Sequence, residues 1–262
     1  MNLRISLARF LIRLGKFIES TAILTMKPDD LVEFSRQSYA TLEDVEAWGE
    51  DDLVDSGLSE EERNLINAVP ESSGKLLLLG VGGGREAIPF ARMGFQVTGV
   101  DFVPAMVEKA KKNAVKREVQ IQGLVQEISQ LDLPPESFDV IWLSRSMYSA
   151  VPTRTRRVEM IRRITKSLKP GGILLCQFHA GSAPLYSPRG KTLRRMIAAA
   201  LGNLSYEDGD SLWLNVEFIH IFESEQAVKS EIEAGGLSVI QFHTNQTRLG
   251  SAVCQKPGKN TQ

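Results

Sequence analysis

Cysteine is scarce in this sequence, and its two residues lie far apart. Cys176 and Cys254 are each set in an apolar run. Two distant cysteines of this kind form neither a disulfide framework nor the closely spaced ligand pairs of a zinc site. We therefore expect buried thiols in a reducing compartment and predict a cytoplasmic protein.

An excess of one charge and a long apolar run are also absent. The 31 basic and 32 acidic residues leave a formal net charge of -1. No nucleic-acid partner is therefore expected. No apolar run approaches the roughly 20 residues that a membrane-spanning helix needs. Charges also interrupt the apolar residues at the N-terminus, so a cleaved signal peptide is not expected.

The N-terminal segment MNLRISLARFLIRLGKFIES predicts a basic amphipathic helix. Apolar residues recur at helical spacing, namely Leu3, Leu7, Phe10, Leu14 and Phe17. The basic residues fall mostly on other faces, namely Arg4, Arg9, Arg13 and Lys16. One interpretation, which we favour, is a stripe that packs on its own domain or on a second subunit. The alternative is a peripheral contact with a membrane surface or a partner.

Residues 1–69 are predicted to form a helical extension ahead of the main domain. The segment 29–62 is rich in acids but carries interleaved aromatic residues, which favours helices over disorder. Ser59 followed by Glu62 is a capping-box pattern that opens a helix reaching about Val69. The breaker cluster Pro70–Gly74 marks the boundary. We assign 70–257 to the main domain and 258–262 to a frayed tail.

From Lys75 the sequence alternates between strand and helix patterns. Predicted strands are 76–79, 96–100, 119–125, 138–143, 173–178, 237–242 and 251–255. Predicted helices are 86–93, 104–115, 153–168 and 223–234. Serial βαβ units imply a mostly parallel sheet covered by helices, a Rossmann-like, doubly wound α/β fold. The rhythm breaks over 180–220, which we predict to be an insertion after the fifth strand.

A glycine-rich loop carries the strongest functional signal. Gly80, Gly82 and Gly84 follow a buried strand and precede a helix, where a sharp turn allows a ligand to approach backbone N–H groups. The next strand ends at Asp101, and an acid at this spacing can accept hydrogen bonds from both hydroxyls of an adenosine ribose. A dinucleotide fold requires G-x-G-x-x-G, but Arg85 stands at the final position. The spacing therefore favours a cofactor without a pyrophosphate.

In these features the chain resembles the class I S-adenosylmethionine methyltransferases. The resemblance rests on LLLLGVGGGREA, VTGVDFVPAMVEKA, LVQEISQLDLPPESFDVIWLS and LKPGGILL, in this order. It implies a seven-stranded sheet whose last strand, Ser251–Gln255, runs antiparallel. It also implies S-adenosylmethionine as cofactor.

The resemblance also implies a role for individual residues. Those expected at the cofactor are Gly80, Gly82, Gly84, Asp101, Phe102, Glu127, Ile128 and Ser144. The glycines would surround the methionine end, Asp101 would hold the ribose, and Phe102, Glu127 and Ile128 would contact the adenine. Two departures affect single contacts. Leu78 replaces a common acid, and Glu127 replaces the commoner aspartate.

The methyl acceptor is expected beyond the carboxyl ends of the strands. The Asn/Asp-Pro-Pro-aromatic run of planar amino-group methylases, a cysteine nucleophile and an acidic metal cluster are all missing there, so no catalytic metal is expected. His179 is the first candidate base and His220, on the expected polar face of a strand, the second. Arg145 and Tyr148 are candidates for holding a substrate anion. A basic run spans the predicted helix 153–168 and suggests a solvated face.

The leading hypothesis is a metal-independent methyltransferase acting on an O or N atom of a small-molecule, lipid or glycan acceptor. A nicotinamide-dependent oxidoreductase and a non-catalytic cofactor-binding scaffold are the alternatives. We further predict that residues 1–69 and 180–220 together cover the substrate mouth, because their aromatic residues would exclude water from the reacting centre.

Overall fold

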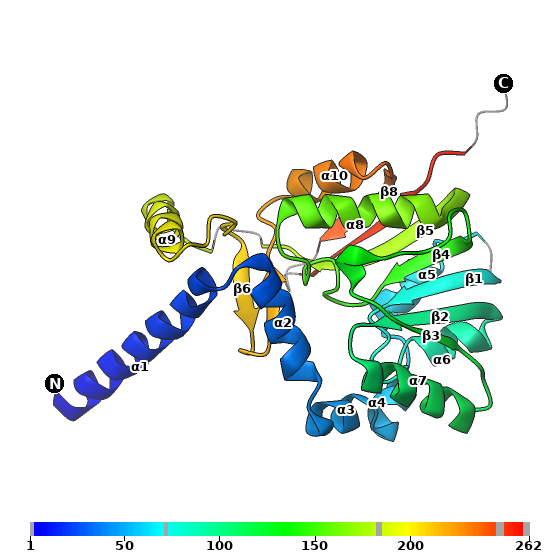
Figure 1. Cartoon of the computed structure of the whole chain (residues 1–262), viewed down its shortest axis with the longest axis horizontal. Helices are drawn as coiled ribbons and strands as arrows, with labels where there is room; N and C mark the ends of the chain where they lie inside the picture. Colours follow the sequence, from blue (N-terminus) through cyan, green and yellow to red (C-terminus); the bar gives the residue numbers. More distant parts are fainter. Residues whose placement is uncertain (1–2, 71–72, 182–184, 245–248, 259–262) are drawn as a thin grey trace.

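The fold is that of a seven-stranded, mostly parallel sheet flanked by helices, as Figure 1 shows for the computed structural model. The structure describes residues 3–70, 73–181, 185–244 and 249–258. The strand order is β3-β2-β1-β4-β5-β9-β8. The strands are β1 Gly74–Leu79, β2 Phe95–Asp101, β3 Gln122–Val125, β4 Phe138–Leu143, β5 Leu168–His179, β8 Ser238–Thr244 and β9 Leu249–Gln255. The predicted fold class is confirmed.

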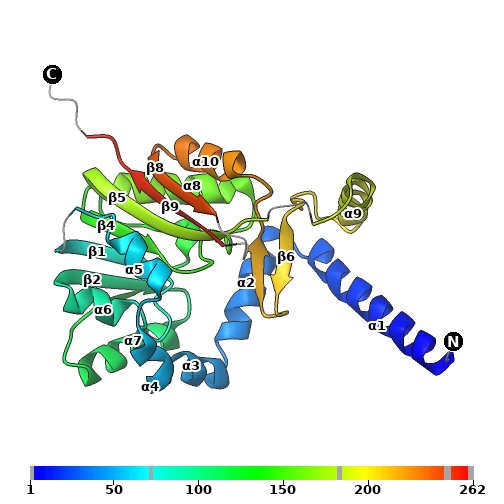
Figure 2. The same cartoon turned by 180° about the vertical axis from the view of Figure 1, so that it is seen from behind.

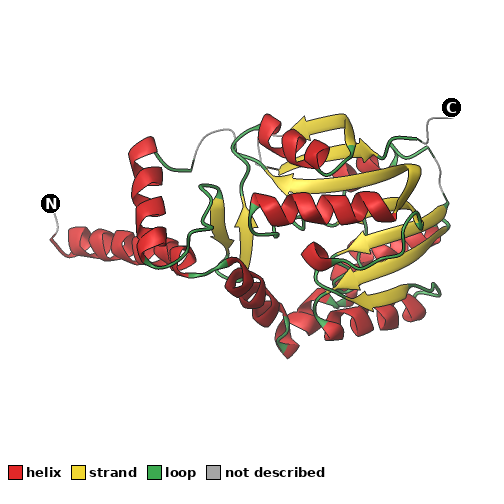
Figure 3. Cartoon of the chain, turned by 45° about the horizontal axis from the view of Figure 1, so that its top comes forward, coloured by secondary structure: helices red, strands yellow, loops and turns green. Residues whose placement is uncertain are grey.

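Alternate side chains of β1 enter two different cores, which explains its continuous apolar run. Leu76 and Leu78 belong to a cluster with helices α5 (Glu60–Ile66), α6 (Ala87–Arg92) and α7 (Pro104–Lys116). Leu77 and Leu79 belong to a cluster with α8 (Arg154–Ser167) and α10 (Glu225–Ala234). A strand buried on both faces needs apolar residues at every position. Figure 3 shows the helices above and below the sheet.

The antiparallel last strand is also confirmed. β9 pairs antiparallel with both β5 and β8, while β1, β2, β3 and β4 pair in parallel. Cys176 and Cys254 lie on the paired strands β5 and β9 as buried free thiols. The predicted tail 258–262, apart from Gly258, lies outside the described residues.

The N-terminal extension consists of helices that lead from one end of the molecule to the sheet. They are α1 Leu3–Ala22, η1 Ile23–Thr25, α2 Pro28–Tyr39, α3 Leu42–Trp48, α4 Asp51–Ser56 and α5. Figure 1 shows α1 projecting from the body, with α2 between it and the sheet and α3 close to α7. Ser59 and Glu62 form the predicted capping box of α5. Within the described chain, no helix is long and apolar enough to cross a bilayer.

The insertion after β5 is more regular than its sequence suggested. We predicted only that the alternating pattern breaks over this segment, and α9 (Pro188–Ala200) and strand β6 (Asp210–Trp213) lie there. β6 pairs antiparallel with β7 (Glu217–His220) as a separate hairpin. Figure 2 shows α9 and this hairpin at the end of the molecule from which α1 projects. Ser187 caps α9 and Pro188 opens it, two helix-start signals that the surrounding turn residues obscured.

Candidate functional site

The glycine loop turns sharply at the carboxyl end of β1. The N–H groups of Gly80 and Val81 both donate to the Val100 carbonyl, at 2.8 and 2.9 Å. Gly82 has a φ of +48°, and a Cβ built on it meets nothing within 4 Å. This position is therefore open toward the cavity described below. Gly84 differs, because a Cβ there lies 3.5 Å from the Ala110 backbone on α7.

Asp101 ties the loop to the end of β2. Its Oδ2 accepts from the Gly82 N–H and its Oδ1 from the Val103 N–H, both at 3.0 Å. Burial raises the pKa of this carboxyl, and the backbone N–H groups partly offset that effect. A carboxylate has about four acceptor positions, so two remain for a ligand. Asp101 thus shapes the glycine loop and still faces the cavity with acceptor capacity for a ligand.

Arg85 locks the N-terminal extension onto the loop. Its guanidinium donates to both Glu62 carboxylate oxygens, at 2.6 and 2.7 Å, and to the Gly57 carbonyl at 2.7 Å. Next to it, a Cβ on Gly83 would lie 2.0 Å from the Trp48 carbonyl oxygen. Arginine and glycine at these two positions are therefore explained by contact with the extension.

A cavity of about 860 Å³ opens at the carboxyl ends of the strands. The glycine loop, Asp101 and the residues after β4 line one wall. The opposite wall comes from α2 to α5 and from the β6–β7 hairpin. The Tyr39 hydroxyl donates to Glu217 at 2.8 Å and joins these two elements. Residues of both predicted covering segments thus line the cavity, whereas none of the described lining residues belongs to α1.

Most residues expected at the cofactor line this cavity. They are Gly80, Gly82, Asp101, Phe102, Glu127, Ile128 and Ser144. The Ser144 hydroxyl donates to the buried Glu86, whose pKa is raised by burial. Glu127 caps the short helix η2 (Ile128–Gln130) by accepting from the Ser129 N–H at 3.2 Å. Gly84, which was also expected at the cofactor, instead packs on α7 and does not line the cavity.

His179 lies at the end of β5 and lines the same cavity. Its Nε2 lies 2.8 Å from the Ser146 hydroxyl, and its ring centroid lies 5.4 Å from that of Trp213. Burial, and next the charge of Arg145, lower the pKa of the imidazole. Ser146 has a φ of +70°, which is unfavourable for a serine. This conformation is accommodated where the hydroxyl meets His179.

Arg145 is exposed on the cavity wall. In the described part of the chain, no hydrogen bond or ion pair holds its guanidinium. A positive charge beside a largely apolar cavity is suited to an anionic or ionising ligand group. The structure therefore leaves Arg145 in the position expected of a substrate contact.

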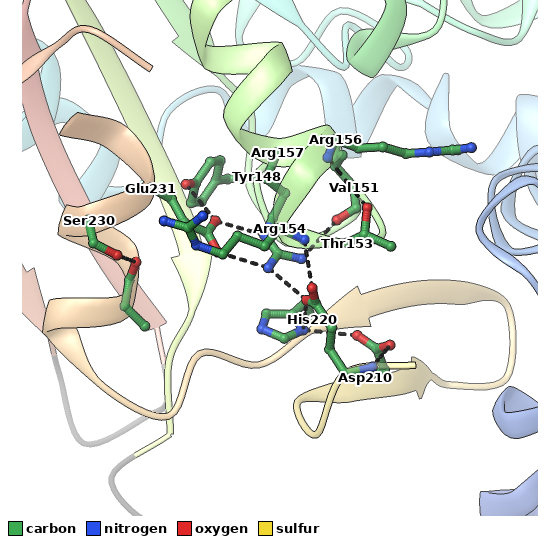
Figure 4. Close-up of polar contacts among 12 residues, drawn as sticks. Tyr148, Val151, Thr153, Arg154, Arg156, Arg157, Asp210, His220, Ser230 and Glu231 are labelled. Carbon is green, nitrogen blue, oxygen red and sulfur yellow. Dashed lines mark hydrogen bonds and ion pairs between the residues drawn. The ribbon is translucent and has the colours of Figure 1, made fainter. Parts of the chain in front are cut away.

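Tyr148 and His220 lie elsewhere, which corrects two predictions (Figure 4). Tyr148 is fully buried, and its hydroxyl donates to Glu231 at 3.1 Å. His220 is buried on β7, where its Nδ1 lies 2.9 Å from Asp210. Neither lines the cavity. The polar strand face expected around His220 is absent, because all four residues of β7 are buried.

The network around His220 also corrects the solvated face predicted for α8. Arg157 is 1% exposed and pairs with Glu231 and Glu207, each at 2.8 Å. Ligand atoms of Glu207, Asp210 and His220 lie within 4.8 Å of one another, close enough for a metal. Their atoms, however, already bind Arg157 and one another. The cluster is a buried ion network that ties the hairpin to α8 and α10.

The contacts of Ser146 and Trp48 could not be predicted from the sequence, because their partners, His179 and Gly83, are distant in sequence. Gly83 carried a usable signal, since a third consecutive glycine is more than the G-x-G-x-G pattern needs.

Comparison with known proteins begins with a family model. Residues 77–176 match the model described as a methyltransferase domain. The chain is similar to the ubiquinone biosynthesis O-methyltransferase of Paramagnetospirillum magneticum, at 39% identity over 100 residues, 38% of each chain. It spans about two fifths of the length of the first curated relatives it matches. An uncharacterized methyltransferase of Synechocystis is 29% identical over 66% of this chain and 77% of that protein.

Solved structures agree on the fold. The CcbJ methyltransferase from Streptomyces caelestis superposes with a TM-score of 0.62 at 16% identity, covering 86% of this chain and 99% of that one. At this identity the likeness extends to the fold alone. The matched region 77–176 contains the glycine loop, Asp101 and the residues after β4.

Proposed function

We propose that this chain, whose residues 77–176 match a methyltransferase domain, is a class I S-adenosylmethionine-dependent methyltransferase that methylates an oxygen atom of a small, largely apolar acceptor. One observation carries the proposal. The glycine loop and Asp101 open into the same cavity as His179 and Arg145. The groups proposed for the cofactor and those proposed for the acceptor therefore line a single cavity.

The residues present fit S-adenosylmethionine. Gly82 is open where a side chain would fill the cavity, and Asp101 retains acceptor positions for two ribose hydroxyls. When bound, this cofactor supplies an electrophilic methyl group on a sulfonium. The chain then has to hold acceptor and methyl close and aligned, which accounts for much of the catalysis in such reactions.

His179 supports an acceptor that loses a proton. Its pKa is lowered by burial and by Arg145, so the imidazole is neutral at pH 7 and can accept a proton. Ser146 positions the ring through Nε2. A hydroxyl acceptor would leave its proton on the imidazole while its oxygen takes the methyl group. The nearby Arg145 would favour the developing negative charge on that oxygen.

Two observations support this acceptor class over the others considered. Apolar and aromatic side chains make up most of the exposed cavity wall, although several carboxylates, Arg85 and Arg145 also line it. Several relatives are named as O-methyltransferases of ubiquinone biosynthesis, which act on an oxygen. A nicotinamide cofactor is disfavoured because Arg85 occupies the last glycine position and is committed to Glu62.

The test begins with calorimetry of the purified full chain against S-adenosylmethionine, S-adenosylhomocysteine and NAD. We expect the first two ligands to bind and NAD not to bind. Release of S-adenosylhomocysteine is then screened over phenols, carboxylic acids, alcohols and amines. The proposal predicts turnover with a hydroxyl acceptor and a loss of kcat, with unchanged cofactor affinity, in His179→Gln. Binding of NAD alone would overturn the cofactor assignment. Turnover confined to amines would overturn the acceptor assignment.

A further inference from the structure

Helix α1 presents an apolar stripe that nothing in the described chain covers. The stripe recurs every three or four residues, and its side chains are 42–60% exposed, namely Leu7, Phe10, Leu11, Leu14 and Ile18. The side chains of Leu3, Lys16 and Phe17 lie outside the described ones. We expected this stripe to pack on its own domain or on a second subunit, and the first of these is wrong. An uncovered stripe of this length indicates a binding surface.

The C-terminal end of α1 is fixed to the body by two hydrogen bonds. Arg194 of α9 donates to the Ser20 carbonyl at 2.8 Å, and Asn215 in the β6–β7 turn bonds Glu19. The main contacts of α1 are with η1, which follows it. Figures 1 and 2 show the rest of the helix extending away from the sheet. The stripe is thus presented outward on a helix anchored at one end.

The charge of the first eighteen residues is unlike that of the rest of the protein. They contain four bases and no acid, whereas the remaining chain has 27 bases and 32 acids. In the described residues, neither Arg9 nor Arg13 takes part in an ion pair. On a helical wheel both lie away from the stripe. A helix with apolar residues on one face and bases on the other is suited to a negatively charged lipid surface.

A second apolar surface lies at the same end of the molecule. Leu193 and Met196 of α9 are 55% and 65% exposed, and α9 packs against η1. Lys191 and Arg195 on α9 already pair with Asp208. This helix therefore adds apolar area, and Arg9 and Arg13 of α1 add positive charge.

A second copy of the chain fits the stripe less well than lipid does. Packing two α1 helices together through their stripes would leave Arg9 and Arg13 of each copy on the outer faces, without an acid before Glu19 to pair with them. The stripe also covers only about three turns, which is short for an isolated coiled coil.

We propose that α1 binds an anionic membrane surface, lying in the headgroup region with its stripe toward the acyl chains, and that α9 lies against the same surface. The inference does not depend on the methyl acceptor. It adds that the enzyme acts while bound to a membrane surface. The β6–β7 turn that bonds α1 also carries Leu214 of the cavity wall and follows Trp213 of the same wall, so the cavity would be held close to the lipid.

The test is vesicle flotation of the purified full chain, with phosphatidylcholine vesicles that contain or lack phosphatidylglycerol. We expect binding only to the vesicles that contain phosphatidylglycerol, and weaker binding at high salt. Arg9→Gln with Arg13→Gln should weaken partitioning about 30-fold. Leu7→Ser with Leu14→Ser should weaken it at least about tenfold. Both variants should keep wild-type melting temperature and affinity for S-adenosylhomocysteine, because none of the four residues lines the cavity.

The matched control is Lys112→Gln with Val115→Ser, one base and one exposed apolar residue on α7. It should bind vesicles like the wild type. The proposal is overturned if the wild type ignores vesicles containing phosphatidylglycerol, or if the α1 variants bind as tightly as the control. A dimer in light scattering that becomes a monomer in the Leu7, Leu14 variant, without vesicle binding by the wild type, would assign the stripe to a second copy. Each outcome leaves the methyltransferase proposal to its own assay.

Discussion

Replacing Glu62 by glutamine should unlock the N-terminal extension from the glycine loop. In the wild type, Glu62 is 2% exposed and Arg85 meets both of its carboxylate oxygens. Removing one partner of a buried pair costs about 3–5 kcal/mol. The Arg85 side chain keeps 21% exposure and retains Glu86 at 3.0 Å. We therefore expect a loss at the lower end, about 3 kcal/mol, or roughly 6–12 °C in Tm for a protein of this size.

The assay is urea unfolding followed by circular dichroism, at pH 7, with Glu61→Gln as matched control. Glu61 is the exposed neighbour on the same helix, so its neutralisation should change the free energy of unfolding by no more than about 0.5 kcal/mol. A double-mutant cycle with Arg85→Gln should show a coupling energy of at least about 1 kcal/mol. A Glu62→Gln variant as stable as the control would refute the lock, as would an additive cycle.

The pH dependence gives an independent check on the same ion pair. Burial alone would raise the pKa of Glu62, but the bonds from Arg85 and Ser59 bring it below its usual value. A carboxyl with a lowered folded pKa stabilises the protein above the unfolded pKa of about 4.3, and the stabilisation is lost as pH falls through the folded pKa. The stability gap between wild type and Glu62→Gln should therefore be constant near neutrality and narrow in acid.

Three further predictions concern the cavity. Asp101→Ala should weaken S-adenosylhomocysteine binding about 10²- to 10⁴-fold by calorimetry, because two charge-assisted bonds are lost; unchanged affinity in a folded variant would contradict the ribose assignment. Gly82→Val should abolish binding, whereas Gly171→Val, also at positive φ with open space around it, should not. Equal affinities would show that the loop does not touch the cofactor. Arg145→Gln should raise the pKa of His179 and move the acid limb of the kcat/KM profile to higher pH. An acid limb that does not move would show that Arg145 does not affect the pKa of the catalytic base.

The sheet was predictable because its signals are local. The run Leu76–Leu79 is apolar at every position, since each face of β1 meets its own layer of helices. The Ser59–Glu62 capping box likewise acts within three residues and placed α5 correctly. The cofactor side of the cavity was predicted for the same reason, because the loop residues and Asp101 are positioned by the ends of two neighbouring strands.

The acceptor side was less predictable because it depends on distant pairs. The sequence predicted a solvent-exposed Arg157, but this residue is buried against Glu231, which lies 74 residues away in the sequence. His220 suggested a strand face open to the site, but Asp210 holds it inside the hairpin. Tyr148 was correctly predicted to follow β4, but its side chain is buried in the core and does not reach the site. No periodicity in the sequence reports such pairings.

The two walls of the cavity come from different parts of the chain, and this has a consequence for acceptor specificity in related enzymes. The cofactor side belongs to the stretch 77–176 that matches the family model, whereas the facing wall comes from 32–62 and 213–221, outside that stretch. The Tyr39–Glu217 hydrogen bond joins the two outer pieces to each other. Changes in these two pieces can therefore reshape the space proposed for the acceptor, while the glycine loop and Asp101 stay unchanged. A chimera that receives both pieces from a related enzyme should exchange acceptor preference as a unit.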